Sequence, residues 1–204
     1  MKYIILIISL LSLTSCFSQI HPIYDLNRPF DDTGLYFKDL NSDLDKYVGT
    51  WVWEENSNRL TVVLQKSVMH NMFDRYQEDI IVGNYKYEEN GVIIIDTMTN
   101  PAPLPNLSSD VFSIKLWSSN RSPNISELYG RILDPIRSYY ASYNLECYYT
   151  PPGLSPIGST TPGEPAKMRF AARSNGLLST PWDQPLDTRP VTSRIPYDII
   201  MLKQ

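Results

Sequence analysis

The stretch DLDKYVGTWVWE, residues 43–54, is the most informative part of this chain about its fold. Ser42 lies just before its first aspartate and provides an N-cap for one helical turn. A strand is predicted directly after this turn, over residues 48–53, where Trp51 and Trp53 lie two positions apart and share one face. The stretch therefore predicts a helical turn that leads into a strand with a strongly apolar face.

Beyond this stretch, short runs of alternating polar and apolar residues recur, separated by Gly, Pro, Asn and Ser. In residues 165–173, PAKMRFAAR, Met168 and Phe170 face one side while Lys167 and Arg169 face the other. Helical periodicity is nearly absent, so the pattern predicts an antiparallel all-β domain. Strands are expected at residues 48–53, 60–68, 80–87, 92–97, 111–117, 127–133, 142–149, 166–173 and 195–202.

The clearest turn is Asn90-Gly91, because these residues readily adopt the positive φ angles of a tight hairpin. Pairing across this turn places Tyr85 and Tyr87 on one face together with Ile94 and Asp96. If that face is the interior, Asp96 is a buried carboxylate that either orients a polar ligand or is satisfied by a tyrosine hydroxyl or water. The second strand, VIIID, is apolar on both faces, so we expect it to be central or covered.

Two proline-rich segments interrupt the strand pattern. Residues 150–166 carry five prolines and residues 176–190 carry three. Proline has no N–H to donate to a ladder, so neither segment is a central strand. Loops of this length are either functional or mobile. Trp182, in the second loop, is expected to pack across an end of the domain or to line the rim of a binding site.

The N-terminus predicts export. Lys2 is followed by eleven almost purely apolar residues, 3–13, whereas a membrane-spanning helix needs roughly 20. This length is typical of a signal peptide, which we place at residues 1–18. Residues 19–41 show no periodicity and are expected to form a flexible linker or an arm lying on the domain, which then occupies residues 42–204.

Two cleavage sites fit this signal peptide. Leu13-Thr14-Ser15-Cys16 resembles a bacterial lipobox, which would make Cys16 the acylated N-terminus. Alternatively, Cys16 and Ser18 are the small residues of an ordinary cleavage site, and Gln19 begins a secreted chain. We favour lipidation, because all four lipobox positions match; several acyl chains on Cys16 would then give a stable anchor. The prediction is then a periplasmic or outer-membrane lipoprotein that contacts the membrane only through the lipid on Cys16.

Composition narrows the possible functions. Without Lys2 the chain has 17 Lys and Arg against 22 Asp and Glu, a net charge of −5. This acidic balance, without a basic cluster, argues against nucleic-acid binding. Cys147 is the only cysteine beyond the signal region, so no disulfide is expected within the domain. We interpret Cys147 as a buried apolar side chain rather than a reactive thiol.

The stretch around Gly49-Thr50-Trp51 resembles the opening of lipocalin-like (calycin) barrels, in which the glycine allows close backbone approach and the tryptophan closes the barrel floor. With IVGNYKYEENGVII, GRILDP and IPYDIIMLK, it is similar to a family of exported Gram-negative bacterial proteins of unknown function, over roughly residues 44–203. The resemblance implies one all-β, antiparallel, lipocalin-like up-and-down β-barrel of about eight to nine strands with proline-rich loop insertions. It implies no activity and no functional residues.

Residues that carry chemistry are sparse. His21 and His70 are the two histidines, and no cluster of His, Cys, Asp or Glu has the spacing of a zinc site. Residues 39–50 place Asp and Asn at alternate positions as a calcium loop does. The glycine and the glutamate that such a loop requires are Leu44 and Thr50, so we interpret the segment as a solvated acidic turn.

Adjacent acidic residues at positions 54–55, 78–79 and 88–89 are interpreted as ordinary solvated surface in turns. No two carboxylates can be placed facing one another, and no nucleophile elbow or phosphate-binding glycine loop occurs. We therefore expect no catalytic residues, no metal, no cofactor and no enzymatic activity.

Two functions fit these observations. As a binding protein, the barrel would hold a small apolar or amphipathic ligand in its interior. As a cell-envelope structural or interaction protein, it would have a solid core, and its loops or strands would contact a protein partner. We rank ligand binding marginally ahead, on the analogy of fold alone. The residues expected to line the ligand are Trp51, Trp53, Tyr85, Tyr87, Ile94, Asp96, Phe112 and Ile114.

Overall fold

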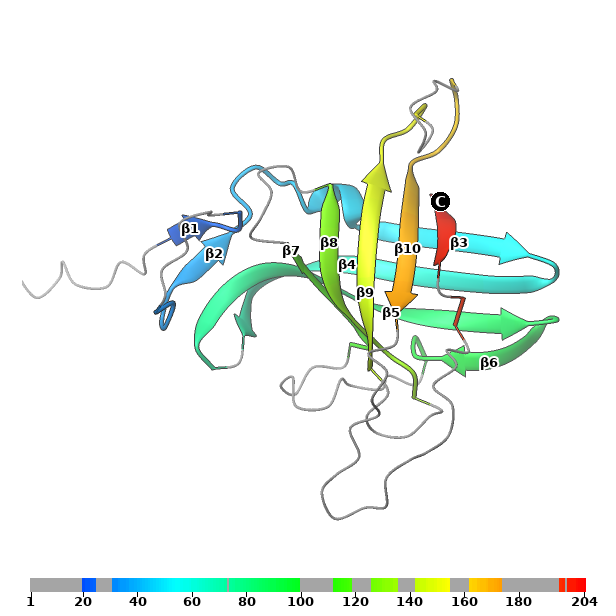
Figure 1. Ribbon diagram of the computed structural model, residues 1–204, viewed down its shortest axis with the longest axis horizontal. Coiled ribbons are helices and arrows are strands. Elements are labelled where there is room, and N and C mark those ends of the chain that lie inside the picture. The colour runs from blue at the N-terminus through cyan, green and yellow to red at the C-terminus, as the bar shows by residue number, and fades with distance from the viewer. Residues whose placement is uncertain are drawn as a thin grey trace, which may run out of the picture.

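A computed structural model describes residues 20–24, 31–72, 74–99, 112–118, 126–135, 142–154, 162–173, 195–196 and 198–204 (Figure 1). The predicted signal peptide with Cys16, much of both proline-rich loops, and Trp182 lie outside these residues. The described elements are the 3-10 turn η2 (Asp45–Tyr47) and the strands β1 (Ile20–Pro22), β2 (Tyr36–Lys38), β3 (Gly49–Glu55), β4 (Asn58–Met72), β5 (Tyr76–Glu89), β6 (Val92–Asp96), β7 (Ile114–Ser118), β8 (Glu127–Leu133), β9 (Ser142–Thr150), β10 (Lys167–Arg173) and β11 (Asp198–Lys203).

Eight of these strands close into a barrel. Their order is β5-β4-β3-β11-β10-β9-β8-β7, and pairing between β7 and β5 closes the ring. Neighbouring strands in this ring are antiparallel throughout. The predicted antiparallel, lipocalin-like all-β barrel is thus confirmed. Neighbouring strands of the ring are consecutive in the chain except at two contacts, β3–β11 and β5–β7.

Side chains from alternate positions of the barrel strands meet in one core. Met168 and Phe170 of β10 are fully buried while Arg169 is exposed, as the alternation predicted. Burial of such apolar area is the main favourable contribution to folding. Among the largest fully buried side chains are Trp51, Tyr47, Tyr85, Phe37 and Phe170.

The segment at residues 19–41 is not simply a linker. Its β1 pairs in parallel with β2, and β2 pairs in parallel with β5 at the edge of the sheet. Ile23 and Phe37 are fully buried in the main core, and the Ser118 hydroxyl donates a hydrogen bond of 2.8 Å to the Ile23 carbonyl. The flexible-linker prediction is therefore wrong for these strands, and the alternative, an arm lying on the barrel, describes them.

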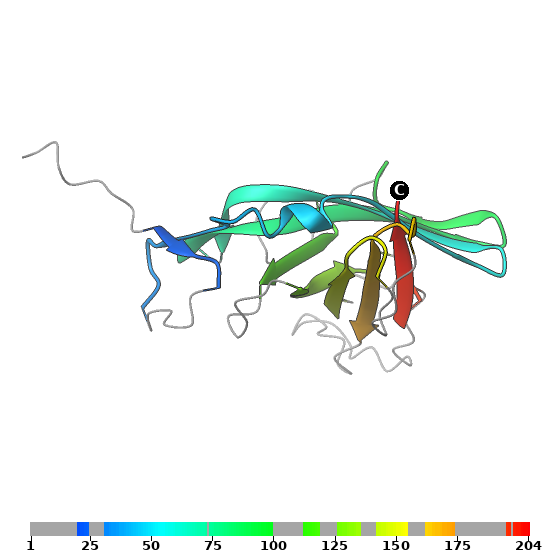
Figure 2. The same ribbon diagram turned by 90° about the horizontal axis from the view of Figure 1, so that it is seen from above.

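Three barrel strands, β3, β4 and β5, extend beyond the barrel and form a projection together with β6 (right side of Figure 1). We call this projection the finger; it comprises residues 53–59 of β3–β4 and 86–96 of β5–β6. Seen from above, the finger is a thin sheet that extends past the barrel (Figure 2). Among the described strands, β6 pairs only with β5. Val92 and Ile93 are 61% and 55% exposed, so the expectation that β6 is central or covered is wrong.

A glycine fixes the close approach of two barrel strands. Gly130 of β8 lies opposite Leu116 of β7, and a Cβ at position 130 would lie 1.9 Å from the carbonyl oxygen of Lys115. The contacting atom is backbone, so it cannot move away without breaking the β7–β8 ladder.

We expect Gly130→Ala to destabilise the protein by about 2–3 kcal/mol, the upper part of the usual range for overpacking. The measurement is urea unfolding followed by circular dichroism. Gly163→Ala is the control for loss of a glycine, because nothing lies within 4 Å of a Cβ there, although its φ of +83° will add a smaller cost of its own. Equal losses in the two variants would contradict the steric explanation.

Candidate functional site

Residues 47–51, from the end of η2 into β3, contribute to one group of contacts in the barrel core. The Trp51 indole N–H donates a hydrogen bond of 2.8 Å to the Tyr47 carbonyl, and its ring meets the Tyr149 ring edge-on at 6.3 Å between centroids. The Lys203 ammonium lies 5.4 Å from the Trp51 ring centroid. Trp51 is fully buried and belongs to the main core.

Gly49 makes room for this arrangement. Its φ is +130°, and a Cβ there would lie 3.1 Å from the Cε atom of Lys203. Positive φ favours glycine. The close approach implied by the family resemblance is therefore made by the side chain of Lys203 rather than by backbone.

The structure brings six of the eight predicted ligand-lining residues together in the main core. Trp51, Tyr85 and Ile114 are fully buried, and the Tyr85 hydroxyl donates a hydrogen bond of 2.6 Å to the Leu133 carbonyl. Side chains and hydrogen bonds within the protein thus occupy this region. The six residues are Trp51, Trp53, Tyr85, Tyr87, Ile94 and Ile114.

Phe112 lies elsewhere. It packs against a second, smaller cluster formed by Met72, Ile80 and Val82 on the outer face of the barrel wall. Ile114, two residues further on, belongs to the main core instead. The alternation that placed both residues inside fails because strand geometry begins only at Ile114.

Asp96 does not share a face with the tyrosines. The β5–β6 register shifts after Tyr87, so that Tyr87 lies opposite Ile95 and Asp96 lies opposite Lys86. Burial alone would raise the pKa of Asp96, but hydrogen bonds from Thr99 and Met98, together with the charge of Lys86, outweigh it and lower the pKa. The carboxylate therefore caps the turn after β6, and the predicted ligand-orienting position is corrected.

A buried carboxylate, Asp79, connects three segments at the end of β4 and β5 that lies away from the finger. Asp79 is 2% exposed and accepts hydrogen bonds from the Tyr36 hydroxyl at 2.7 Å, the Met69 N–H at 3.0 Å and the Asp39 N–H at 3.0 Å. Burial, followed by the bond to Asp79, raises the pKa of the Tyr36 phenol well above its usual range. One carboxylate thus joins β2, the β-bulge in β4 between Ser67 and His70, and β5.

A lysine extends this network to the acidic turn. Asp39 accepts hydrogen bonds from the N–H groups of Asp43 and Leu44, and the Lys66 ammonium lies 2.7 Å from Asp39 and 3.0 Å from Asp45. Burial alone would lower the pKa of Lys66, but its bonds to both carboxylates raise it. In the segment whose spacing resembles a calcium loop, the Lys66 ammonium therefore pairs with two of the carboxylates, those of Asp39 and Asp45. Asp39 is buried rather than solvated.

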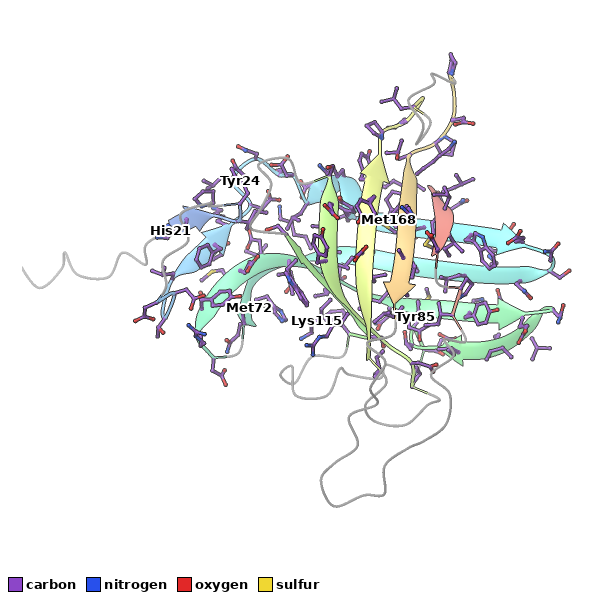
Figure 3. All side chains as sticks on the ribbon, in the orientation of Figure 1. His21, Tyr24, Met72, Tyr85, Lys115 and Met168 are labelled. Atoms are coloured by element: carbon purple, nitrogen blue, oxygen red, sulfur yellow. The ribbon has the colours of Figure 1, made fainter. Side chains whose placement is uncertain are left out.

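Three further titratable side chains lie on the outer face of the wall, beside the second cluster. His70 lies directly opposite Glu78, and Lys115 approaches the His70 Nε2 atom to 3.3 Å. The other ring nitrogen of His70, Nδ1, lies 3.3 Å from the Ser67 hydroxyl, so both ring nitrogens have a polar neighbour. In Figure 3, Lys115 and Met72 lie on the side of the barrel where the N-terminal arm joins it.

Neither the Asp79 network nor the group of His70, Glu78 and Lys115 was predicted from the sequence. Glu78 and Asp79 are 1% and 2% exposed, so their interpretation as solvated turn residues is wrong. They lie inside β5, which begins at Tyr76, earlier than the predicted strand. The usable signal was that two acids directly precede the apolar run Ile80–Val82 without an intervening turn residue.

Cys147 is fully buried within the main core, and burial raises the pKa of its thiol well above the usual range. Its interpretation as an apolar core side chain is confirmed. Within the described residues, no group of three His, Cys, Asp or Glu side chains is arranged to hold a metal ion. No helix in the same part of the chain has the length and hydropathy needed to span a membrane.

Comparison with protein families identifies the family of this chain. The model of a family of unknown function, DUF6705, matches residues 1–204. No curated protein matches the chain, and no solved structure does. The predicted likeness to a family without a known function is confirmed, whereas an exported, Gram-negative origin stays a prediction.

Proposed function

This chain belongs to the DUF6705 family, and we propose that it is an exported interaction protein of the cell envelope, with a solid-core barrel as scaffold and a protein as partner. The observation that carries the proposal is that six of the eight residues expected to line a ligand pack in or against the main core. Trp51, Tyr85 and Ile114 are fully buried in the main core. Barrels of eight strands are small enough to be filled by their own side chains.

Polar groups in this core support the same proposal. The Trp51 N–H and the Tyr85 hydroxyl both bond to backbone carbonyls, those of Tyr47 and Leu133. A ligand that displaced these side chains would have to replace both hydrogen bonds, since an unsatisfied buried polar group costs about 1–3 kcal/mol. The finger and the N-terminal arm, in contrast, place strands outside the barrel where a partner can reach them.

The proposal is tested with the mature protein and a panel of fatty acids, phospholipids and apolar dyes. We expect no saturable change in tryptophan fluorescence and no rise in melting temperature, because the buried aromatic side chains leave the interior occupied. Saturable binding that quenches the buried tryptophan would overturn the solid core and favour a small-ligand protein instead.

The envelope role has its own test. Intact mass of the protein from membranes should show an acylated chain beginning at Cys16, and Cys16→Ala should release it from the membrane. Cross-linking in envelope fractions should recover one stoichiometric partner. An unacylated chain beginning at Gln19 would contradict the anchor, and a clean monomer after cross-linking would contradict the interaction role.

A further inference from the structure

The two edges of the finger differ in charge. β11 pairs with β3 only at Trp51 and Val52, so residues 53–55 form one edge of the finger, where Glu54 and Glu55 are exposed. Charged side chains on an edge strand discourage pairing with another chain. The β3 edge is thus protected against pairing with another chain by its charged side chains.

The β6 edge carries apolar side chains instead. Val92 and Ile93 are 61% and 55% exposed, and the next acidic residue of the strand is Asp96 at its end. Two other apolar side chains of the finger, Tyr87 and Ile95, belong to the main core instead. An edge with exposed apolar residues is suited to strand addition, in which an extended peptide pairs with the edge and its side chains contact alternate positions.

Charge indicates what kind of segment fits. The finger contains five acidic residues and two basic ones, a net charge of −3. Both basic side chains are already paired, Arg59 with Glu54 and Lys86 with Glu88, each at 3.2 Å. A second copy of this chain would bring another −3 to the same place, so self-pairing is opposed, whereas a basic segment is attracted. The acidic residues are Glu54, Glu55, Glu88, Glu89 and Asp96.

Cross-strand registers give the positions of the expected contacts. One row of directly opposed residues runs Glu54, Arg59, Glu88 and Ile93 across the four strands. A strand added beyond β6 would place its own side chain beside Ile93, at the end of this row. Three of these residues also line a hollow at the finger tip together with Glu55 and Gly91.

We propose that the β6 edge of the finger binds an extended, basic segment of a partner protein as an additional strand, with apolar residues against Val92 and Ile93 and a basic residue near Asp96. This proposal rests on the proposed interaction function and names the surface that performs it.

The test is selection of displayed peptides on the full mature protein. We expect peptides in which apolar and basic residues alternate, with binding that weakens as salt increases. Ile93→Lys should reduce affinity for a selected peptide at least tenfold, because it places a positive charge on the edge. Val63→Lys is the matched control, since Val63 is 41% exposed on β4, which is paired on both sides, and should leave affinity unchanged.

A second measurement does not depend on any variant. A selected peptide that is N-methylated at alternate residues, on the edge that faces β6, should lose binding, because strand addition uses backbone N–H groups. Equal binding to wild type and Ile93→Lys, no loss on methylation, acidic selected peptides, or no selected peptide at all would overturn the proposal. So would a stable dimer that Ile93→Lys dissociates, since the occupant would then be a second copy. The interaction function itself is judged separately, by the ligand panel and the envelope cross-linking.

Discussion

Trp51→Ala is expected to lower the free energy of unfolding by about 3–5 kcal/mol, the usual range for removing a buried tryptophan. The substitution opens a cavity in the main core and removes the bond to the Tyr47 carbonyl, together with the contact to the Tyr149 ring. Because Tyr47 ends the helical turn η2, the turn loses one of the hydrogen bonds that hold it against the first barrel strand. Urea denaturation followed by circular dichroism measures the loss.

Trp53→Ala is the matched control for this prediction. Trp53 is the same residue type in the same strand, but it is only partly buried against the core. We expect its loss to cost clearly less than that of Trp51. A Trp51→Ala protein within about 1 kcal/mol of wild type, well below the usual cost, would show that the core around Trp51 is not packed as described.

Asp79→Ala is expected to cost about 3 kcal/mol or more, because it leaves three donors, two of them in buried hydrogen bonds, without their shared acceptor. These donors are the Tyr36 hydroxyl and the N–H groups of Asp39 and Met69. Their loss should free β2 and the bulge in β4 from β5. Hydrogen exchange should therefore increase first at these segments, and the free energy of unfolding, measured in urea, should fall.

Glu89→Ala serves as the control, since it removes an exposed carboxylate from the end of the same strand and should change stability by less than about 0.5 kcal/mol. A double-mutant cycle with Tyr36→Phe isolates one of the bonds. We expect Asp79→Ala to cost less in the Tyr36→Phe background. Additive effects of the two substitutions would contradict a direct bond between these side chains.

Much of the fold was predictable because its signals are local. Alternation in β10 identified Met168 and Phe170 as core residues, and the Gly49-Thr50-Trp51 stretch predicted an inward-facing tryptophan, which is buried in the main core. Asn90-Gly91 gave the turn of the β5–β6 hairpin, where both residues have positive φ. Each of these features depends on residues within a few positions of one another.

The candidate site was less predictable, because it depends on pairing between distant segments. The buried carboxylate of Asp79 accepts a hydrogen bond from the backbone N–H of Asp39, forty residues earlier. Asp96 turned away from the tyrosines through a one-residue change of register, which moves every later side chain of a strand to the other face. Six of the eight predicted lining residues came together, but as packed core rather than as the wall of a described ligand site.

The class of fold, the two faces of β10 and the β5–β6 turn follow from the sequence alone, since a period of two residues and a turn are properties of a short segment. The edge position of β6, the burial of Glu78 and Asp79, and the pairing of the N-terminal arm through β1 and β2 became evident only in the three-dimensional structure. Those outcomes depend on which segment supplies the neighbouring strand or donor, and that neighbour lies tens of residues away in the chain.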